Sequence, residues 1–194
     1  ITTINFFDFI NKKKINKIIY SSSISVKLYE KNLINESRYL YAFLKSINEK
    51  YIFNFCKKNN IKLIICRISN IYGGKEKYTF INNLINSYKN NKVFYFNNTN
   101  ESRDFIHVND VAKIYMELIK NNATGYLEIG TGKLIKLKDL VAIFKDKVKI
   151  KNIINKNNNN KNKDQSMKLL KINTTLLKKY KNINILIKLN KYLE

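Results

Sequence analysis

Two apolar runs with one long amphipathic segment between them constrain the fold of this chain more than any other feature. The first run is KIIY at residues 17–20, and the second is IKLIICR at residues 61–67. Between them, residues 38–58 repeat apolar side chains at helical spacing. Continuous apolar runs of this length are typical of strands in parallel sheets, which are buried on both faces. The order therefore predicts a strand–helix–strand unit with a right-handed crossover, and an α/β fold.

Shorter patterns of the same two kinds alternate along the rest of the chain. We expect helices over residues 3–14, 78–90, 109–120, 137–144, 173–180 and 184–193, and strands over residues 93–96, 104–107, 125–129 and 148–153. Residues 21–37 are expected to be mainly a loop. Residues 155–163, NKNNNNKNK, have the low complexity of another loop.

Length and composition exclude several classes of protein. The 194 residues are 44% hydrophobic, which is enough for a sizeable core, and no run of 18 apolar residues predicts a membrane span. The first residues, ITTINFFDFINKKK, read as a helix without the cleavage site of a secretory signal. Cys56 and Cys66 have no metal-binding or CxxC spacing, so we expect no metal site and two buried free thiols in the cytoplasm.

The net charge of +23 raises the hypothesis of a basic nucleic-acid-binding protein. However, lysines occur in almost every segment, and the chain has no Pro and no Trp, which indicates a compositional bias that acted on the whole sequence. No recognised nucleic-acid-binding motif accompanies the charge. Solvated lysines are therefore the expected interpretation, and nucleic-acid binding is kept as an alternative.

Tyr41 and Lys45 are the first candidates for chemistry. They are four residues apart in the helix expected over residues 38–58, so their side chains project side by side. An ammonium stabilises a neighbouring phenolate, and a tyrosine in that position can exchange a proton with a substrate hydroxyl or carbonyl. The pair alone does not identify an activity, because tyrosines and lysines are abundant in this chain.

Five motifs in a fixed order identify a family. They are YSSS at residues 20–23, YAFLK at 41–45 with Glu49 four residues later, RISNIYGG at 67–74, RDFIHVNDVA at 103–112 and YLEIGTG at 126–132. Together they resemble the extended short-chain dehydrogenase/reductases, in particular the NAD-dependent epimerase/dehydratase family that acts on nucleotide sugars. The resemblance covers about residues 3–145 and is weak in the tail.

The resemblance implies catalytic and cofactor-binding roles. Tyr41 is similar to the family's general acid/base, and Lys45 to the residue that makes this tyrosine more acidic and hydrogen-bonds the nicotinamide ribose. Ser23 matches the hydroxyl that polarises the substrate oxygen; Ser22 is an alternative match, and a hydroxyl that caps the turn is the structural alternative. Ser21 and Ser69 are expected beside the cofactor, which the family identifies as NAD, with NADP as the alternative.

The same resemblance implies a site for a nucleotide-diphosphate sugar. Asn70 and Arg103 match residues that contact the diphosphate, and a guanidinium fork suits two phosphate oxygens. An ion pair between Arg103 and Asp104 is the structural alternative. Lys161 and Asp164 occupy positions where the family often closes over the nucleotide.

Three conspicuous features are expected to be structural. Glu49 is interpreted as a carboxylate on the helix surface near Lys45 or Lys50, or as a dimer contact. His107, the single histidine, is interpreted as structural in the family's pattern. Residues 130–132, GTG, are expected to form a turn after a sheet strand, because a dinucleotide-binding loop belongs to the first strand–helix turn.

The predicted architecture is the second half of a Rossmann domain with a small mixed α/β substrate-binding domain. Residues 1–74, with 103–130 packing back on them, form the former, and residues 75–102 and 131–194 the latter. In the complete protein we expect a homodimer through the Tyr41 helix.

Departures from the family limit the functional interpretation. No segment matches the family's GxxGxxG loop, so the first half of the Rossmann domain is expected to be absent and a remnant without independent activity is an alternative. Lys27-Leu28 replaces the usual Tyr-Gly, and Gly74 a usual proline. Ile24 and Ser25 follow Ser23 where dehydratases often have Asp-Glu, which favours an epimerase or a reductase.

Overall fold

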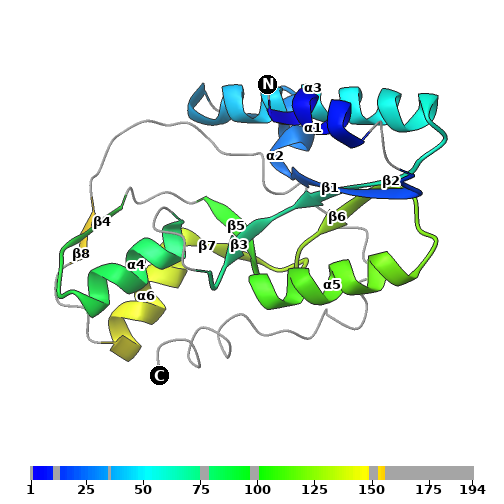
Figure 1. The fold of residues 1–194 in the computed structure, drawn as a ribbon. Coiled ribbons are helices and arrows are strands. Elements are labelled where there is room, and N and C mark those ends of the chain that lie inside the picture. Colours follow the sequence, from blue (N-terminus) through cyan, green and yellow to red (C-terminus); the bar gives the residue numbers. More distant parts are fainter. Residues whose placement is uncertain are drawn as a thin grey trace. The chain divides into compact units, whose positions relative to one another are not determined.

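The computed structural model of the chain describes residues 2–10, 14–34, 36–74, 79–96, 101–148 and 153–155 (Figure 1). The helices are α1 (Thr2–Ile10), α2 (Ser25–Glu30), α3 (Glu36–Lys58), α4 (Phe80–Lys89), α5 (Val108–Lys120) and α6 (Leu137–Val148). The strands are β1 (Lys17–Ser23), β2 (Lys62–Ile68), β3 (Asn70–Tyr72), β4 (Phe94–Phe96), β5 (Ser102–His107), β6 (Gly125–Ile129), β7 (Leu134–Lys136) and β8 (Ile153–Asn155). The fold is α/β and Rossmann-like, as predicted.

The first compact unit lies within residues 1–68 and 115–129. Its three strands pair in the order β1-β2-β6, and both pairings are parallel. Because α3 connects β1 to β2, the strand–helix–strand prediction is confirmed. Helices α1 and α3 cover one face of this sheet (Figure 1). The core on that face is formed by apolar side chains of α1, α3 and β2, namely Phe7, Ile10, Ile52, Cys56, Leu63 and Ile65.

The second compact unit lies within residues 69–114 and 130–194. Strand β5 pairs in parallel with β3 and antiparallel with β7, and β4 pairs in parallel with β8. Helices α4 and α6 supply six of the nine core residues, which are Tyr72, Ile81, Leu84, Ile85, Phe94, Phe105, Leu137, Leu140 and Val141. Thr79 caps α4 by accepting a hydrogen bond from the backbone amide of Asn82 at 3.3 Å.

Asparagine follows the end of three helices in this glycine-poor chain. Asn32, Asn60 and Asn91 have φ angles of 54°, 54° and 51° and lie just after α2, α3 and α4. A left-handed residue after a helix is usually glycine, and asparagine is the next most tolerant. With only five glycines, the chain uses asparagine for this turn.

Several local predictions differ from the structure. Residues 25–30, expected within a loop, form α2, and β3 and β7 were not predicted. Helix α6 continues to Val148, and the strand expected over 148–153 is instead β8, at Ile153–Asn155. The other predicted elements that fall within the described residues are confirmed, with ends that differ by a few residues. The helices expected over 173–180 and 184–193 lie outside those residues.

Among the helices in the described ranges, none has both the length and the apolar character to cross a membrane. Helix α5 begins in the second unit and ends in the first. How the two units correspond to cofactor-binding and substrate-binding domains stays a prediction.

Candidate active site

The three serines at the end of β1 have three different partners. Ser21 Oγ is 2.8 Å from the Tyr115 hydroxyl, and Ser23 Oγ accepts a hydrogen bond from the Ser25 amide at 3.2 Å. The buried hydroxyl of Ser22 donates to the carboxylate of Glu49. The Ser22 hydroxyl is therefore already bound to a charged group, whereas the hydroxyl of the half-buried Ser23 contacts, among the described residues, only the backbone amide of Ser25. Of the two alternative matches for the catalytic hydroxyl, the contacts favour Ser23.

Lys45 is held against the strand that carries these serines. Its Nζ donates a hydrogen bond to the backbone carbonyl of Ser21 at 3.0 Å and lies 5.4 Å from the centre of the Tyr20 ring. Burial lowers the pKa of Lys45, and the nearby Glu49 charge opposes that shift. Tyr41, one helical turn earlier, is about half exposed at 51%. The structure thus brings Lys45 and the serine strand together and leaves the tyrosine accessible.

Glu49 lies in the interior, and the prediction of a surface carboxylate is wrong. Only 2% of the residue is exposed. Arg67 Nη2 donates to Glu49 Oε2 at 2.7 Å, and Arg67 Nε lies within 3.1 and 3.3 Å of the two carboxylate oxygens. Glu49 was missed although it falls on the buried stripe of α3, seven residues after Ala42 and three before Ile52. That helical spacing was the signal that could have identified it.

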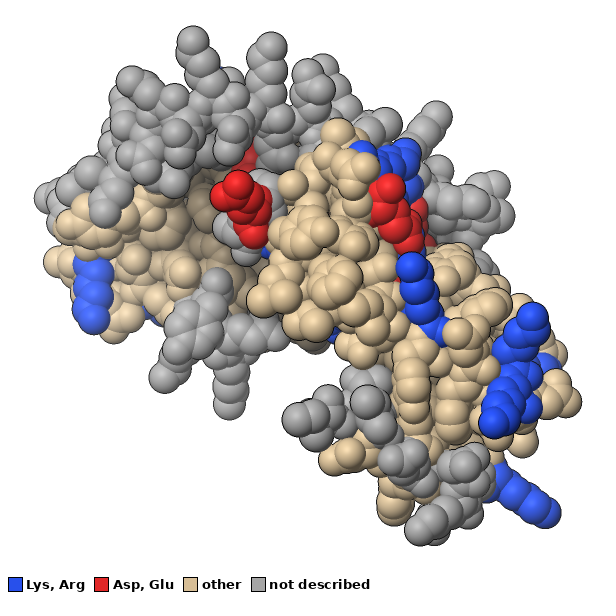
Figure 2. Space-filling model, turned by 90° about the horizontal axis from the view of Figure 1, so that it is seen from above, with Lys and Arg blue, Asp and Glu red and all other residues tan. Residues whose placement is uncertain are grey.

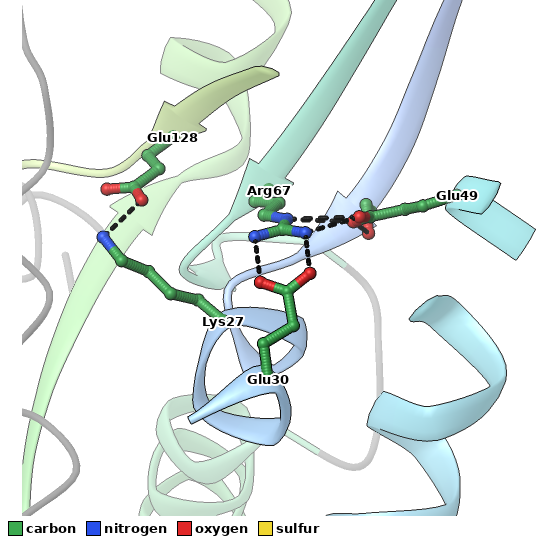
Figure 3. A network of polar contacts seen from close by, with 6 residues as sticks. Lys27, Glu30, Glu49, Arg67 and Glu128 are labelled. Carbon is green, nitrogen blue, oxygen red and sulfur yellow. Dashed lines mark hydrogen bonds and ion pairs between the residues drawn. The ribbon is translucent and has the colours of Figure 1, made fainter. Parts of the chain in front are cut away.

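Arg67 is the centre of a polar network that joins three elements (Figure 3). Besides Glu49 of α3, its guanidinium binds both carboxylate oxygens of Glu30 of α2, at 2.9 and 2.6 Å. It also lies 4.9 Å from the centre of the Tyr126 ring. Burial opposes the charge of Arg67, but the two carboxylates outweigh burial and raise the pKa of Arg67.

A second ion pair ties α2 to the sheet. Lys27 of α2 donates to Glu128 of β6 at 2.5 Å, and both side chains are about four-fifths buried (Figure 3). Ser22, Arg67 and Glu128 occupy paired positions on the adjacent strands β1, β2 and β6. A row of polar side chains therefore crosses the sheet beneath α2 and α3.

In the second unit, Asn70 is hydrogen-bonded to β5, and Arg103 is a residue of that strand. The Asn70 amide donates to the backbone carbonyl of Asp104 at 3.0 Å, and Arg103 Nη2 donates to Glu101 at 2.5 Å. The alternative ion pair between Arg103 and Asp104 is thus wrong. Arg103 Nε and the Ser69 hydroxyl are buried, and neither has a hydrogen-bond partner among the described residues.

Asp104 binds the turn that follows β6. Its carboxylate accepts hydrogen bonds from the amides of Thr131 and Gly132, at 2.9 and 2.7 Å, and from the Thr131 hydroxyl at 2.6 Å. Burial raises the pKa of Asp104, and these hydrogen bonds oppose the shift. The GTG segment is a turn after a sheet strand, as predicted, and its donors bind a carboxylate of the chain itself.

His107 packs against the backbone, in agreement with its structural interpretation. Its Nδ1 accepts a hydrogen bond from the Asn109 amide at 3.1 Å, and its ring meets the Tyr72 ring edge-on at 5.1 Å. Gly73, with φ of +94°, lies so close that a Cβ atom there would be 2.3 Å from His107 Nε2.

The predicted site residues thus form two groups, each within its own unit. Ser21, Ser23, Tyr41 and Lys45 belong to the first unit, and Ser69, Asn70 and Arg103 to the second. Lys161 and Asp164 lie outside the described residues. On the face shown in Figure 2, the basic side chains of the described residues stand in separate places and form no continuous stripe. This distribution does not favour a nucleic-acid interface.

Comparison with known proteins gives one consistent result. A family model described as the NAD dependent epimerase/dehydratase family matches residues 1–130. A putative UDP-glucose 4-epimerase of Methanocaldococcus jannaschii is 29% identical over 161 residues, which are 75% of this chain and 52% of that protein. CDP-abequose synthase of Salmonella muenchen is 31% identical over 112 residues, which are 56% of this chain and 38% of that protein.

Solved structures show the same fold. UDP-N-acetylglucosamine 4-epimerase from Methanobrevibacter ruminantium M1 has a TM-score of 0.66 and 23% identity, over 79% of this chain and 53% of that one. UDP-glucose 4-epimerase from Thermotoga maritima has a TM-score of 0.67 and 18% identity, over 79% and 55%. The chain spans about half the length of the relatives it matches.

Proposed function

Because the chain belongs to the NAD-dependent epimerase/dehydratase family, we propose that it carries the acid–base group of a nucleotide-sugar epimerase, with a reductase or dehydratase as the alternative. The observation that carries the proposal is Lys45, whose ammonium is fixed against the Ser21 carbonyl one turn after Tyr41. A phenol beside a fixed ammonium is suited to proton exchange near neutral pH.

The residues of the first unit fit a nicotinamide cofactor. Lys45 has three N–H donors, and the Ser21 carbonyl takes one of them, so donors remain for a ribose hydroxyl. NAD, with NADP as the alternative, supplies the hydride acceptor when it is bound. Ser21 is the other proposed cofactor contact in this unit. Ser69, which belongs to the second unit and has a buried hydroxyl without a hydrogen-bond partner among the described residues, is a further proposed contact from the sequence.

Tyr41 is the proposed general base for the oxidation. Its phenolate would accept the proton of a sugar hydroxyl, and bound NAD would accept the hydride from the carbon that bears this hydroxyl, which leaves a keto-sugar. Ser23 donates a hydrogen bond to the same oxygen, for which the hydroxyl only needs to rotate. In an epimerase, the bound cofactor would supply the hydride to the opposite face of the keto-sugar, and Tyr41 would return the proton to the sugar oxygen.

The proposed substrate contacts are Asn70 and Arg103, with Lys161 and Asp164 as predictions from the sequence. The support in the second unit is the buried Nε of Arg103, which has no acceptor among the described residues. A diphosphate oxygen would satisfy it. One relative and several of the similar solved structures are named as epimerases, and Ile24-Ser25 after Ser23 favours that reaction over dehydration.

We also propose a homodimer through α3 and a cytoplasmic location. Leu40, Leu44, Ile47 and Tyr51 recur along one face of α3 and are 66%, 50%, 45% and 39% exposed. A continuous apolar face of this kind marks an interaction surface. The two buried free thiols fit a reducing compartment.

Turnover of UDP-sugars with NAD tests the function in protein expressed from its full coding sequence. Tyr41→Phe should lower kcat by about 100-fold or more, because it removes the group that exchanges the proton. Tyr39→Phe is the matched control, since Tyr39 lies on the same helix with the same exposure of about half. Unchanged turnover in Tyr41→Phe would refute the mechanism. Failure of the wild-type protein to bind NAD would support the alternative of a remnant without activity.

A further inference from the structure

We propose that Glu49 and Arg67 are positioning residues for Lys45. They fix where α3 lies along β1, and their charges act on the Lys45 ammonium. The inference rests on the proposed function, in which Lys45 acts on Tyr41. It assigns a role to the buried Arg67–Glu49 ion pair, which the proposed proton transfer does not use.

Two successive turns of α3 hold two successive residues of β1. Lys45 donates to the backbone carbonyl of Ser21, and Glu49, one turn later, accepts from the hydroxyl of Ser22. A helix attached to a strand at two points cannot slide along it or rotate without breaking one of the contacts. The position of Lys45 therefore depends on Glu49.

Arg67 extends this attachment to the turn that carries Ser23. Its guanidinium binds Glu49 on one side and Glu30 of α2 on the other (Figure 3). Helix α2 begins two residues after Ser23, and the intervening Ile24 amide donates to the Ile68 carbonyl at 3.0 Å. One side chain thus links the helix of the acid–base pair to the helix that follows the proposed catalytic hydroxyl. A planar guanidinium can bind two carboxylates at once through pairs of N–H groups, and the ammonium of lysine cannot.

The charges around Lys45 give this role a measurable consequence. Among the described residues, its ammonium contacts the Ser21 carbonyl and lies over the Tyr20 ring, the Glu49 carboxylate acts on its charge, and Tyr41 lies one turn earlier on the same helix. Glu49 favours the protonated lysine, whereas Arg67 neutralises part of the Glu49 charge. Removal of either partner should therefore change the protonation of Lys45, in opposite directions.

The first experiment measures the titration of Lys45 by NMR in the 194-residue chain. Glu49→Gln should lower the pKa of Lys45, because the attracting carboxylate is lost. Arg67→Met should raise it, because the Glu49 charge is no longer neutralised. Glu36→Gln, an exposed carboxylate change on the same helix, is the control and should leave the pKa unchanged.

Shifts in the same direction, or no shift in either variant, would overturn the proposal. Glu49→Gln keeps the size of the side chain and one acceptor oxygen. If Arg67→Met does not fold, the comparison of Glu49→Gln with Glu36→Gln decides the question.

The second experiment separates this proposal from the proposed function, in protein expressed from its full coding sequence. Lys45→Met should abolish turnover of UDP-sugars; if it does not, the proposed function fails. Arg67→Met should lower kcat about 10- to 100-fold with little change in KM, because the reacting groups are displaced and the substrate contacts are intact. Glu49→Gln should move the acid limb of the pH–rate profile to lower pH. Suppose that Lys45→Met is inactive, but Arg67→Met and Glu49→Gln both match Glu36→Gln in kcat and pH profile. The positioning role is then refuted and the proposed function is not.

Discussion

Gly73 and His107 illustrate how one residue restricts its neighbour. Gly73 combines a left-handed φ of +94° with a close approach to the imidazole ring, so a side chain there meets two obstacles. Gly125 has nearly the same φ, +92°, but a Cβ atom there would meet nothing within 4 Å. The two glycines therefore separate the cost of the backbone conformation from the cost of the clash.

We predict that Gly73→Ala lowers the free energy of unfolding by about 2 to 4 kcal/mol, and Gly125→Ala by about 1 kcal/mol. Both substitutions place a side chain on a left-handed backbone, which is unfavourable. Only Gly73→Ala must also displace the His107 ring. Urea unfolding of the two variants measures the difference. Equal losses would mean that the ring moves away without cost.

The two thiols provide a residue-level dependence on pH. Burial raises the pKa of Cys56 and of Cys66 from 9.0 to about 11. Above pH 9 the unfolded chain loses these protons first, so the stabilisation is complete below pH 9 and is lost as the pH rises to about 11.

The free energy of unfolding should accordingly fall between pH 9 and pH 11, and less steeply in Cys66→Ala than in the wild-type chain. Denaturant titration at several pH values measures this fall. At pH 8, a thiol-specific reagent should modify the native chain much more slowly than the urea-unfolded chain. Equal rates in the two states would contradict the burial of both thiols.

At the scale of elements, the attachment of α2 and α3 to the sheet depends on one buried guanidinium. Arg67→Met should lower the free energy of unfolding by about 3 to 5 kcal/mol, because Glu49 then remains buried and unpaired. The double variant Arg67→Met/Glu49→Leu should recover much of this loss, since it removes both buried charges. Glu30→Gln should cost less than about 1 kcal/mol, because Glu30 is nearly half exposed. A double variant as unstable as Arg67→Met would contradict this account.

The exposed apolar face of α3 predicts the oligomeric state of the complete protein. Leu40→Glu/Leu44→Glu should convert a dimer to a monomer in sedimentation equilibrium, because it places charges in the centre of the interface. Met116→Glu/Ile119→Glu is the control, since these two α5 side chains are similarly exposed, at 54% and 60%. A wild-type monomer would refute the dimer.

The sequence predicts long elements better than short ones, for physical reasons. The strand–helix–strand unit has a strong periodic signal over more than forty residues, and the structure confirms it. Helix α2 has only six residues and no side-chain cap, and β3 and β7 have three residues each, so local patterns are too short to identify them. Charged residues were predicted worst. Glu49 was expected at the surface although its helical spacing places it on the buried stripe of α3, and its partner Arg67, eighteen positions away, has no local signal that could identify it.

For the whole molecule, the net charge of +23 predicts some attraction to DNA, whereas the fold gives no reason to expect recognition of a DNA sequence. We expect the chain to bind DNA only weakly, without sequence preference, and to lose most of that binding between 50 and 200 mM salt. Fluorescence anisotropy with duplexes of unrelated sequence measures both properties. Sequence-selective binding that persists at 200 mM salt would revive the nucleic-acid hypothesis.

The division of the predicted site between two units has a consequence for how such a protein can evolve. The acid–base residues lie in the unit whose core is formed by α1, α3 and the parallel sheet, and Asn70 and Arg103 lie in the other unit, which has a core of its own. Substitutions that alter which sugar nucleotide is accepted can therefore accumulate in the second unit while the packing around Lys45 stays the same. Selection for a new substrate then acts on residues whose change leaves proton transfer intact, and one chemistry can serve many sugars.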